Sequence, residues 1–297
     1  MTALAPIALF VYNRLWHTRQ TIEALQKNEL AIESNLIIFS DAPKSDAYKD
    51  AVDAVRLYIR QIAGFRSVTI VEREENFGLA RSIIEGVTFI TNKYDRIIVL
   101  EDDLVTSPYF LMFMNDALNA YQDDEKVMHI SGYMFPIEGS ALPETFFLRT
   151  ASCWGWATWQ RAWKYFDKNP EKLSNEFTDE KISRFNMDGT YNFWSQVEQN
   201  KQRALNTWAI FWYASIFQLN GLCLHPKISM INNIGHDATG EHCAENNDFS
   251  SILAIEPVSY FEKNIDEHVL ALAKTKKFFQ AIKPSLLSRI VRRLKAG

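Results

Sequence analysis

The sequence has few cysteines and no long apolar run, and both shortages limit what the protein can be. Cys153, Cys223 and Cys243 are an odd number without the paired spacing of a zinc site, which favours reduced thiols in the cytoplasm over a disulfide framework. The longest mostly apolar stretch, Thr207 to Leu219, is too short to span a bilayer and predicts a buried helix. The first ten residues lack a basic segment ahead of the apolar run, so they predict a strand and no signal peptide.

The sequence also has no excess of positive charge, no internal repeat and no low-complexity tract. Its 32 Lys and Arg residues are outnumbered by 36 Asp and Glu residues, which gives a net charge of −4. Phosphate backbones select proteins with an excess of basic residues, so this balance argues against a duplex nucleic acid partner and leaves small anionic ligands open. With 297 residues, of which 47% are hydrophobic, the chain can bury a substantial core in one compact fold.

Short β-rich segments alternate with amphipathic helical segments through roughly the first hundred residues. This alternation predicts an α/β fold with a mainly parallel sheet and helices on both faces. In such sheets ligands bind outside the carboxyl ends of the strands, so the polar residues after each strand become site candidates. The predicted strands are Ile7–Tyr12, Leu36–Phe39, Val68–Val71 and Ile97–Leu100. The candidates that follow them are Asn13 and Arg14, then Asp41, then Arg73 to Gly78 with Asn76, and finally Glu101, Asp102 and Asp103.

Three carboxylates, Glu101, Asp102 and Asp103, follow directly on the apolar strand 97–100. Their mutual repulsion and desolvation are costly unless a cation offsets them. Carboxylate oxygens, completed by water and substrate phosphates, suit Mg²⁺ or Mn²⁺ better than zinc. The cluster therefore predicts a divalent metal that acts as a Lewis acid on a departing diphosphate. The alternative is a solvated acidic turn.

Two further polar segments have a functional and a structural interpretation. The turn that contains Asn76 and Gly78 opens an amphipathic helix, where free amides and Arg81 can meet phosphates or a ribose. The alternative is that this turn only caps the helix. Asp41 can accept hydrogen bonds from a base or ribose, or it can stabilise a turn or helix start.

From about residue 133 the chain becomes rich in aromatic residues with less regular periodicity. We divide it into a nucleotide-sugar-binding half at 1–140, an acceptor-binding and catalytic-loop half at 141–265, and a basic amphipathic tail at 266–297. Trp154 and Trp156 flank Gly155 in a predicted loop, where one of them can stack on an acceptor sugar. Trp208 and Trp212 are assigned to packing because they lie one turn apart on the predicted buried helix.

The tail combines basic and apolar residues. From Lys274 to Gly297 it has eight Lys and Arg residues and no Asp or Glu. Such a segment can bind anionic lipid as a peripheral contact on the inner face of the membrane. The alternative is an ordinary helix that packs on the domain by its apolar side.

Taken together, these segments resemble a known family, the bacterial glycosyltransferases of the GT-A fold, in the broad inverting class that includes N-acetylglucosaminyltransferase I. The acidic triplet with the upstream Asn-Phe-Gly-Leu is the most specific part of the resemblance, which covers roughly Pro6 to Cys243. The matching stretches are Phe10–Arg14, Phe39–Asp41, Arg73–Leu79, Val99–Leu104 with Ser107–Pro108, Ser131–Tyr133, Trp154–Trp159, Asn233–Asp237 and Gly240–Cys243.

The resemblance implies roles for the nucleotide-binding half. Asp103 would be the direct metal ligand, Asp102 would face the donor ribose, and Glu101 would support the metal through water. The residues that it places around the nucleotide are Arg14, Asp41 and Arg73.

The resemblance also implies that a late loop closes over the donor. His242 matches a position where some GT-A enzymes have a metal or diphosphate ligand. His236 precedes it by six residues and is expected on the acceptor side.

The resemblance does not identify the general base. Inverting transfer needs a group that takes the proton of the acceptor hydroxyl. In N-acetylglucosaminyltransferase I an Asp follows a Trp, but the corresponding stretch here, Asn206 to Ile210 around Trp208, has no carboxylate. The candidates are Asp237, Glu241 and Glu198, in that order.

The sequence therefore predicts a metal-dependent inverting glycosyltransferase, a hexosyl- or N-acetylhexosaminyl-transferase. The donor would be a nucleoside diphosphate sugar, with UDP favoured, and the acceptor a glycan or glycolipid in the synthesis of surface polysaccharide such as lipopolysaccharide or capsule. One alternative is a sugar-phosphate nucleotidyltransferase, which usually has a Gly-rich loop after the first strand; residues 12–16 have no glycine. The other is a catalytically silent glycan-binding protein with the same fold.

Overall fold

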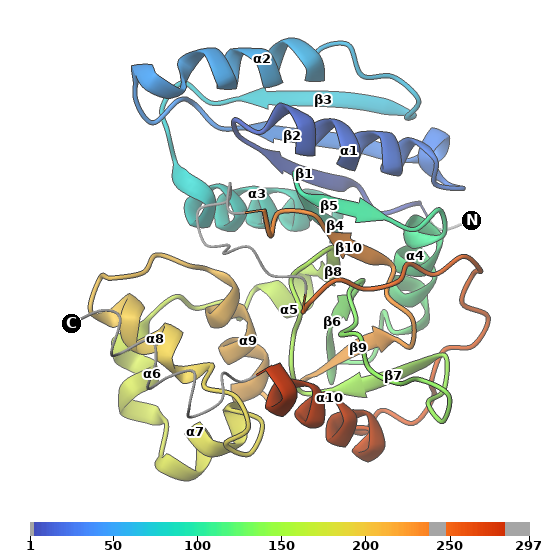
Figure 1. Ribbon diagram of the computed structural model, residues 1–297, viewed down its shortest axis with the longest axis vertical. Helices are drawn as coiled ribbons and strands as arrows, with labels where there is room; N and C mark the ends of the chain where they lie inside the picture. Colours follow the sequence, from blue (N-terminus) through green and yellow to red (C-terminus); the bar gives the residue numbers. More distant parts are fainter. Residues whose placement is uncertain (1–2, 238–247, 283–297) are drawn as a thin grey trace.

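The computed structural model describes residues 3–237 and 248–282 and is built around one eight-stranded sheet (Figure 1). The strand order is β3-β2-β1-β4-β8-β6-β9-β7, and a second sheet pairs β10 with β5. The strands are β1 (Ile7–Val11), β2 (Asn35–Ser40), β3 (Ser67–Glu72), β4 (Arg96–Glu101), β5 (Leu104–Thr106), β6 (Val127–Ser131), β7 (Thr145–Leu148), β8 (Trp156–Trp159), β9 (Leu222–Pro226) and β10 (Ile231–Asn233).

The sheet is mainly parallel, as predicted. β3, β2, β1 and β4 pair in parallel, and β6 pairs in parallel with β9. β8 runs antiparallel to both of its neighbours, and β7 runs antiparallel to β9. The carboxyl ends of the first four strands therefore meet at one edge, which brings together residues that are far apart in the sequence.

Helices cover both faces of the sheet because successive strand residues point to opposite sides. Leu9 packs in the cluster that contains residues of α1 (Leu15–Gln26), α2 (Lys49–Ile59) and α4 (Phe110–Ala120). Phe10, the next residue, packs in the cluster of α3 (Gly78–Tyr94). The predicted fold class is thus confirmed. Helix α2 buries Val52, Val55 and Ile59 and ends at Ile59.

The second half adds a helical layer beside the part of the sheet away from β3 (Figure 1). Helix α9 confirms the buried helix predicted from the apolar run, and Trp212 in it is fully buried. Helix α9 spans Ala209–Gln218, and the other helices of this layer are α5 (Gln160–Trp163), α6 (Pro170–Glu176), α7 (Asp179–Phe185) and α8 (Trp194–Lys201). Two short 3₁₀ helices lie in the first half of the chain, at Ala31–Glu33 and Asp46–Tyr48.

Trp156 differs from its predicted place in a loop. It is the first residue of β8 and is only 1% exposed. Its ring stacks on that of Trp208, with 5.4 Å between the ring centroids. An acceptor sugar cannot reach a side chain buried in this way, so Trp154, which is half-buried, is the one of the two predicted stacking residues that stays a candidate.

The described part of the basic tail is helix α10 (Val269–Ile282), which lies against β7 (Figure 1). Ala271 packs with Phe146 and Leu148 of β7, and Lys276 forms an ion pair of 2.9 Å with Asp188. Up to residue 282 the tail is therefore a helix packed on the domain, which was the alternative interpretation. The remaining tail residues lie outside the described part.

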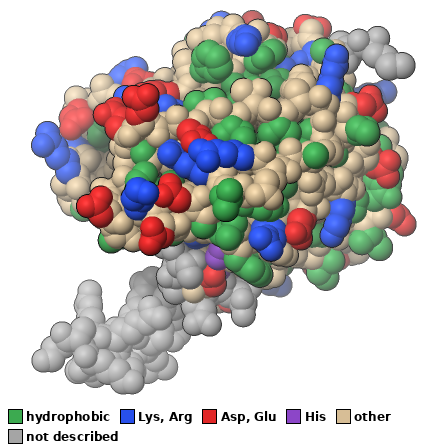
Figure 2. Space-filling view, turned by 90° about the horizontal axis from the view of Figure 1, so that it is seen from above, with side chains coloured by type: hydrophobic (Ala, Val, Ile, Leu, Met, Phe, Trp, Pro, Cys, Tyr) green, Lys and Arg blue, Asp and Glu red, His purple; other side chains and the backbone are tan. Residues whose placement is uncertain are grey.

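Charged side chains of both signs are mixed on the described surface. Figure 2 shows acidic and basic side chains interspersed over the face of α2 and β3, where Lys49 pairs with Asp53 and Arg60 with Glu72.

Two of the three cysteines lie in the described part of the chain. Cys153 and Cys223 are free thiols, whereas Cys243 lies outside the described residues. No helix within 3–237 and 248–282 has both the length and the apolar composition needed to cross a membrane.

Candidate functional site

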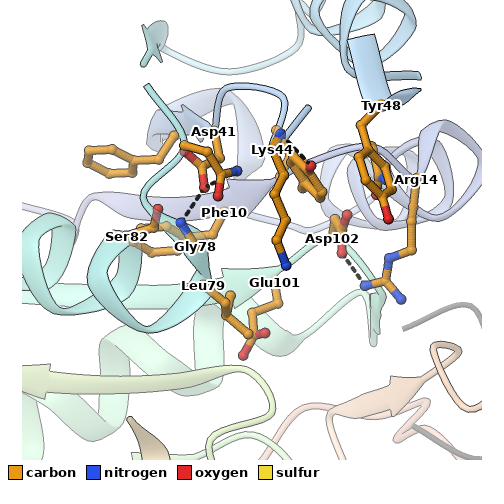
Figure 3. A pocket seen from close by; sticks show the side chains of 15 residues that line it. Phe10, Arg14, Asp41, Lys44, Tyr48, Gly78, Leu79, Ser82, Glu101 and Asp102 are labelled. Atoms are coloured by element: carbon orange, nitrogen blue, oxygen red, sulfur yellow. Dashed lines mark hydrogen bonds and ion pairs between the residues drawn. The ribbon is translucent and has the colours of Figure 1, made fainter. Parts of the chain in front are cut away.

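A cavity of about 340 Å³ opens at the carboxyl ends of β1, β2 and β4, the edge that the strand alternation predicted. It is closed on one side by the start of α3 (Figure 3). Five predicted donor-binding residues and one predicted metal-binding residue line it. Its lining consists of Phe10, Val11, Tyr12, Asn13, Arg14, Phe39, Asp41, Lys44, Tyr48, Asn76, Gly78, Leu79, Ser82, Glu101 and Asp102.

The two sides of the cavity differ in chemistry. Phe10 and Ser82 lie at one side, and Arg14 and Asp102 lie at the other (Figure 3). On the apolar side, the rings of Phe10 and Phe39 stack with 4.9 Å between their centroids. The hydroxyl of Ser82 is buried there and has no hydrogen-bond partner in the described structure. The cavity therefore suits a ligand with a flat, partly polar group at one end and a charged group at the other.

Asp41 joins the end of β2 to the start of α3. Its Oδ1 accepts hydrogen bonds from the backbone N–H groups of Ala42 and Phe77, each at 2.9 Å. Its Oδ2 accepts from the N–H of Gly78 at 2.8 Å and from the amide of Asn76 at 3.2 Å. These bonds take all four acceptor positions of a carboxylate. Asp41 thus caps α3 from a distant segment and has no position left for a base or ribose, which agrees with its structural interpretation.

The chain can turn sharply at this point because Gly78, the first residue of α3, has φ of +69°. A residue with a Cβ atom rarely adopts this conformation. The carboxylate of Asp41 then meets the N–H groups of Phe77 and Gly78 at once. Asn76 reinforces the join, since its amide also donates to the carbonyl oxygen of Ala42 at 2.6 Å.

We expect Asp41→Ala to lower the free energy of unfolding by about 2–4 kcal/mol, because it leaves the N–H groups at the start of α3 without their charged acceptor. Urea denaturation followed by circular dichroism measures this change. Asp46→Ala, an exposed residue a few positions later, is the matched control and is expected to change stability by less than about 0.5 kcal/mol. Equal stability of the two variants would contradict this role of Asp41.

Arg14 forms the centre of the acidic corner. Its Nη2 contacts Oδ1 of Asp102 and lies 2.7 Å from Oδ2 of Asp103. The contact arises because β1 and β4 are parallel neighbours, so the residues after them emerge side by side. Part of the negative charge is therefore offset by the protein itself, which the sequence analysis did not foresee. The second terminal nitrogen of Arg14, Nη1, is buried and has no hydrogen-bond partner in the described structure.

One guanidinium does not offset three carboxylates. Burial raises the pKa of Glu101, and the neighbouring Asp103 and Asp102 raise it further. Burial also raises the pKa of Asp102, although Arg14 opposes this rise. The corner therefore still favours an additional cation when all three groups are ionised.

The segment 231–237 brings part of the predicted acceptor-binding half to this corner. β10 pairs with β5, and the N–H of Ile234 donates to the carbonyl oxygen of Asp103 at 2.9 Å. A Cβ atom on Gly235 would lie 2.1 Å from Oδ2 of Asp103, so only glycine allows this approach. The ring of His236 lies 5.2 Å from that of Trp154. Its Nε2 is buried without a hydrogen-bond partner in the described part of the chain.

The donor set at the corner fits a divalent metal only with help from a ligand. Among the described residues, no three His, Cys, Asp or Glu side chains converge as a metal site. Asp102 and Asp103 do converge, since both contact the same Arg14 nitrogen. One or two carboxylates completed by substrate phosphates and water is a common way to bind Mg²⁺. His242, the third predicted metal ligand, lies outside the described residues.

The base candidates have different surroundings. Asp237 is partly exposed, and its Oδ2 lies 3.0 Å from Nε2 of the buried His17. Glu198 is exposed on α8 and does not line the cavity. Glu241 lies outside the described residues. Trp16, which is 59% exposed, packs edge-on against His17, so an exposed aromatic ring also lies near Asp237.

Two predicted donor-binding residues do not line the cavity. The guanidinium groups of Arg73 and Arg81 lie 3.9 Å and 3.5 Å from the ring centroid of Phe77. Arg81 also forms an ion pair of 2.7 Å with Glu85. Both arginines stabilise the turn ahead of α3 in this structure.

The structure adds lining residues that the sequence analysis missed, Lys44, Tyr48 and Ser82. Ser82 lies one helical turn after Gly78 and so shares a face of α3 with the start of the helix. That spacing could have identified it. Lys44 and Tyr48 follow Asp41 in an irregular segment, where spacing alone does not indicate direction.

Comparisons with known proteins leave the family open. No protein-family model and no curated protein matches the sequence. Among solved structures, a mannosyltransferase from Pyrobaculum calidifontis in complex with GDP-Man and Mn²⁺ is 10% identical, with 74% of this chain and 70% of that chain covered and a TM-score of 0.39. Mouse xyloside xylosyltransferase 1 is 10% identical, with 72% and 81% covered and a TM-score of 0.36. A UDP-glucose pyrophosphorylase with UDP-glucose is 14% identical, with 57% and 82% covered and a TM-score of 0.34. Likenesses this weak do not establish what this chain binds.

Proposed function

We propose that the protein is a metal-dependent inverting glycosyltransferase that moves a sugar from a nucleoside diphosphate donor, with UDP favoured, to a glycan or glycolipid acceptor in surface polysaccharide synthesis. One observation carries the proposal: the cavity combines an apolar side with a charged side, and each side has a buried polar group without a hydrogen-bond partner in the described structure, Ser82 Oγ and Arg14 Nη1. Such groups are costly unless a ligand completes their hydrogen bonds.

The donor would lie along the cavity. The nucleoside would pack against Phe10 and Leu79 and bond to Ser82, and the diphosphate would meet the guanidinium of Arg14. Asp103 would hold the metal with Glu101, Asp102 and His242 close by, and the metal would offset the charge that develops on the diphosphate. Asn13 and Asn76 would contribute polar contacts from the cavity wall.

The acceptor would approach from the 231–237 side, where Trp154 and His236 lie beside Asp103. Asp237 would take the proton of the attacking hydroxyl while the hydroxyl oxygen bonds to the anomeric carbon and the bond to the diphosphate breaks. The buried His17, whose Nε2 lies 3.0 Å from Oδ2 of Asp237, would lie beside this carboxylate. Peripheral contact with anionic lipid on the inner face of the membrane is proposed for the basic residues after 282.

The test is a reaction of the protein with a nucleotide-sugar and Mn²⁺, run with and without added pyrophosphate. A glycosyltransferase releases nucleoside diphosphate slowly even without an acceptor. A nucleotidyltransferase instead consumes pyrophosphate and forms a nucleoside triphosphate, and a silent glycan-binding protein does neither. The segment after β1 does not favour the nucleotidyltransferase, since the chain passes through Tyr12, Asn13 and Arg14 into α1 without a glycine. Formation of nucleoside triphosphate would overturn the proposal.

A further inference from the structure

Lys44 presents a positive charge to the cavity from the segment after β2, whereas Arg14 lies at the start of α1. It follows the end of β2 and lines the cavity. Figure 3 shows its side chain extending into the cavity, with the ammonium directed between Glu101 and Asp102. Within the described residues, the only hydrogen bond of Lys44 is made by its backbone, and its ammonium forms no ion pair.

The base of this side chain is anchored on both sides. The N–H of Lys44 donates to the hydroxyl of Tyr12 at 3.0 Å. Two residues earlier, the carbonyl oxygen of Ala42 accepts from the amide of Asn76. The chain from 42 to 44 is therefore tied to the end of β1 and to the turn ahead of α3, which fixes the point from which the Lys44 side chain extends.

The charge of the site explains what such a lysine can do. Asp102 and Asp103 already take up the Nη2 of Arg14, so the cavity retains an excess of negative groups. A diphosphate that enters beside these carboxylates is repelled unless further cations face it. Lysine is a compact charge that commonly binds phosphate. A side chain that reaches in from the segment after β2 can meet the phosphates from another direction than Arg14.

We propose that Lys44 binds the diphosphate of the donor and, together with Nη1 of Arg14, holds it from two sides. This inference rests on the proposed function, because it assigns a residue to the donor that the function requires. Lys44 would contact the phosphates of the donor, whereas the apolar side of the cavity would contact its nucleoside.

The test compares the binding of UDP and of uridine to the full-length protein by isothermal titration calorimetry. Lys44→Ala is expected to weaken UDP binding by about tenfold or more, because a charge-assisted hydrogen bond is lost, and to leave uridine binding unchanged. Lys44→Arg is expected to retain most of the UDP affinity. Lys49→Ala is the matched control: it removes the same charge from the same segment, but Lys49 pairs with Asp53 outside the cavity.

The outcomes separate the inference from the proposed function. If the wild-type protein binds UDP and Lys44→Ala binds it equally well, the role of Lys44 is refuted and the proposed function stands. An equal loss in Lys49→Ala would also refute it, since the effect would then come from net charge. If neither UDP nor GDP binds to the wild-type protein, the nucleotide cavity itself is refuted, and the proposed function with it.

Discussion

The Asp103→Ala variant is expected to lose about 10³-fold or more of the rate of nucleoside diphosphate release from a nucleotide-sugar in the presence of Mn²⁺. Asp103 is the proposed direct metal ligand, and its carboxylate lies where Arg14 and the 231–237 segment meet. Without it, the proposed metal would lose its principal protein ligand. Initial rates of nucleoside diphosphate release measure the effect.

The variant is also expected to stay folded. Arg14 keeps its contact with Asp102 when Asp103 is removed, so no buried cation is left without a partner. Asp123→Ala, at an exposed position after the end of α4 that does not line the cavity, is the control and should retain full activity. A thermal melt separates loss of metal from loss of fold. Wild-type activity in a folded Asp103→Ala protein would refute the metal assignment.

Manganese binding supplies a second readout of the same site. No three ligating side chains converge among the described residues, so we expect the protein to bind Mn²⁺ weakly alone and more tightly with UDP, whose phosphates complete the site. In Asp103→Ala this increase with UDP should disappear. Tight Mn²⁺ binding without nucleotide would show that the protein itself supplies the ligands.

The Asp237→Asn variant is expected to lower kcat by about 10²–10⁴-fold, because asparagine cannot take the proton of the acceptor hydroxyl. Asparagine keeps the volume of the side chain and an oxygen that can face His17. Asp237 does not line the cavity, so the dissociation constant of UDP should not change. Steady-state kinetics with an acceptor and UDP titration together check both statements.

The same kinetic assay tests a control variant and the other two candidates for the general base. Asp266→Asn, which removes an exposed carboxylate paired with Lys126, should leave kcat unchanged. Glu241→Gln and Glu198→Gln test the two lower-ranked base candidates. If one of these lowers kcat by the predicted factor and Asp237→Asn does not, the general base is that residue, and the contact between His17 and Asp237 is structural.

Much of the fold could be predicted because the residues of regular elements repeat with a fixed period. Leu9 and Phe10 belong to opposite faces of β1 simply because they are adjacent in a strand. The position of Glu101 at the ligand edge followed from its place after an apolar strand in an alternating α/β sequence. The strand formed by Trp156 could not be predicted in this way, since Gly155 and the irregular pattern around it indicated a loop.

The candidate site was predicted in part, and the limit has a physical cause. The sequence by itself determined which polar residues follow the strands, and so which of them reach one edge of the sheet. It did not determine that the carboxylate of Asp41 accepts hydrogen bonds from the start of α3, or that one nitrogen of Arg14 contacts two carboxylates. Nor did it determine that the side chain of Lys44 extends into the cavity. Those facts depend on side-chain directions and on distances between segments far apart in the chain, which only tertiary packing sets.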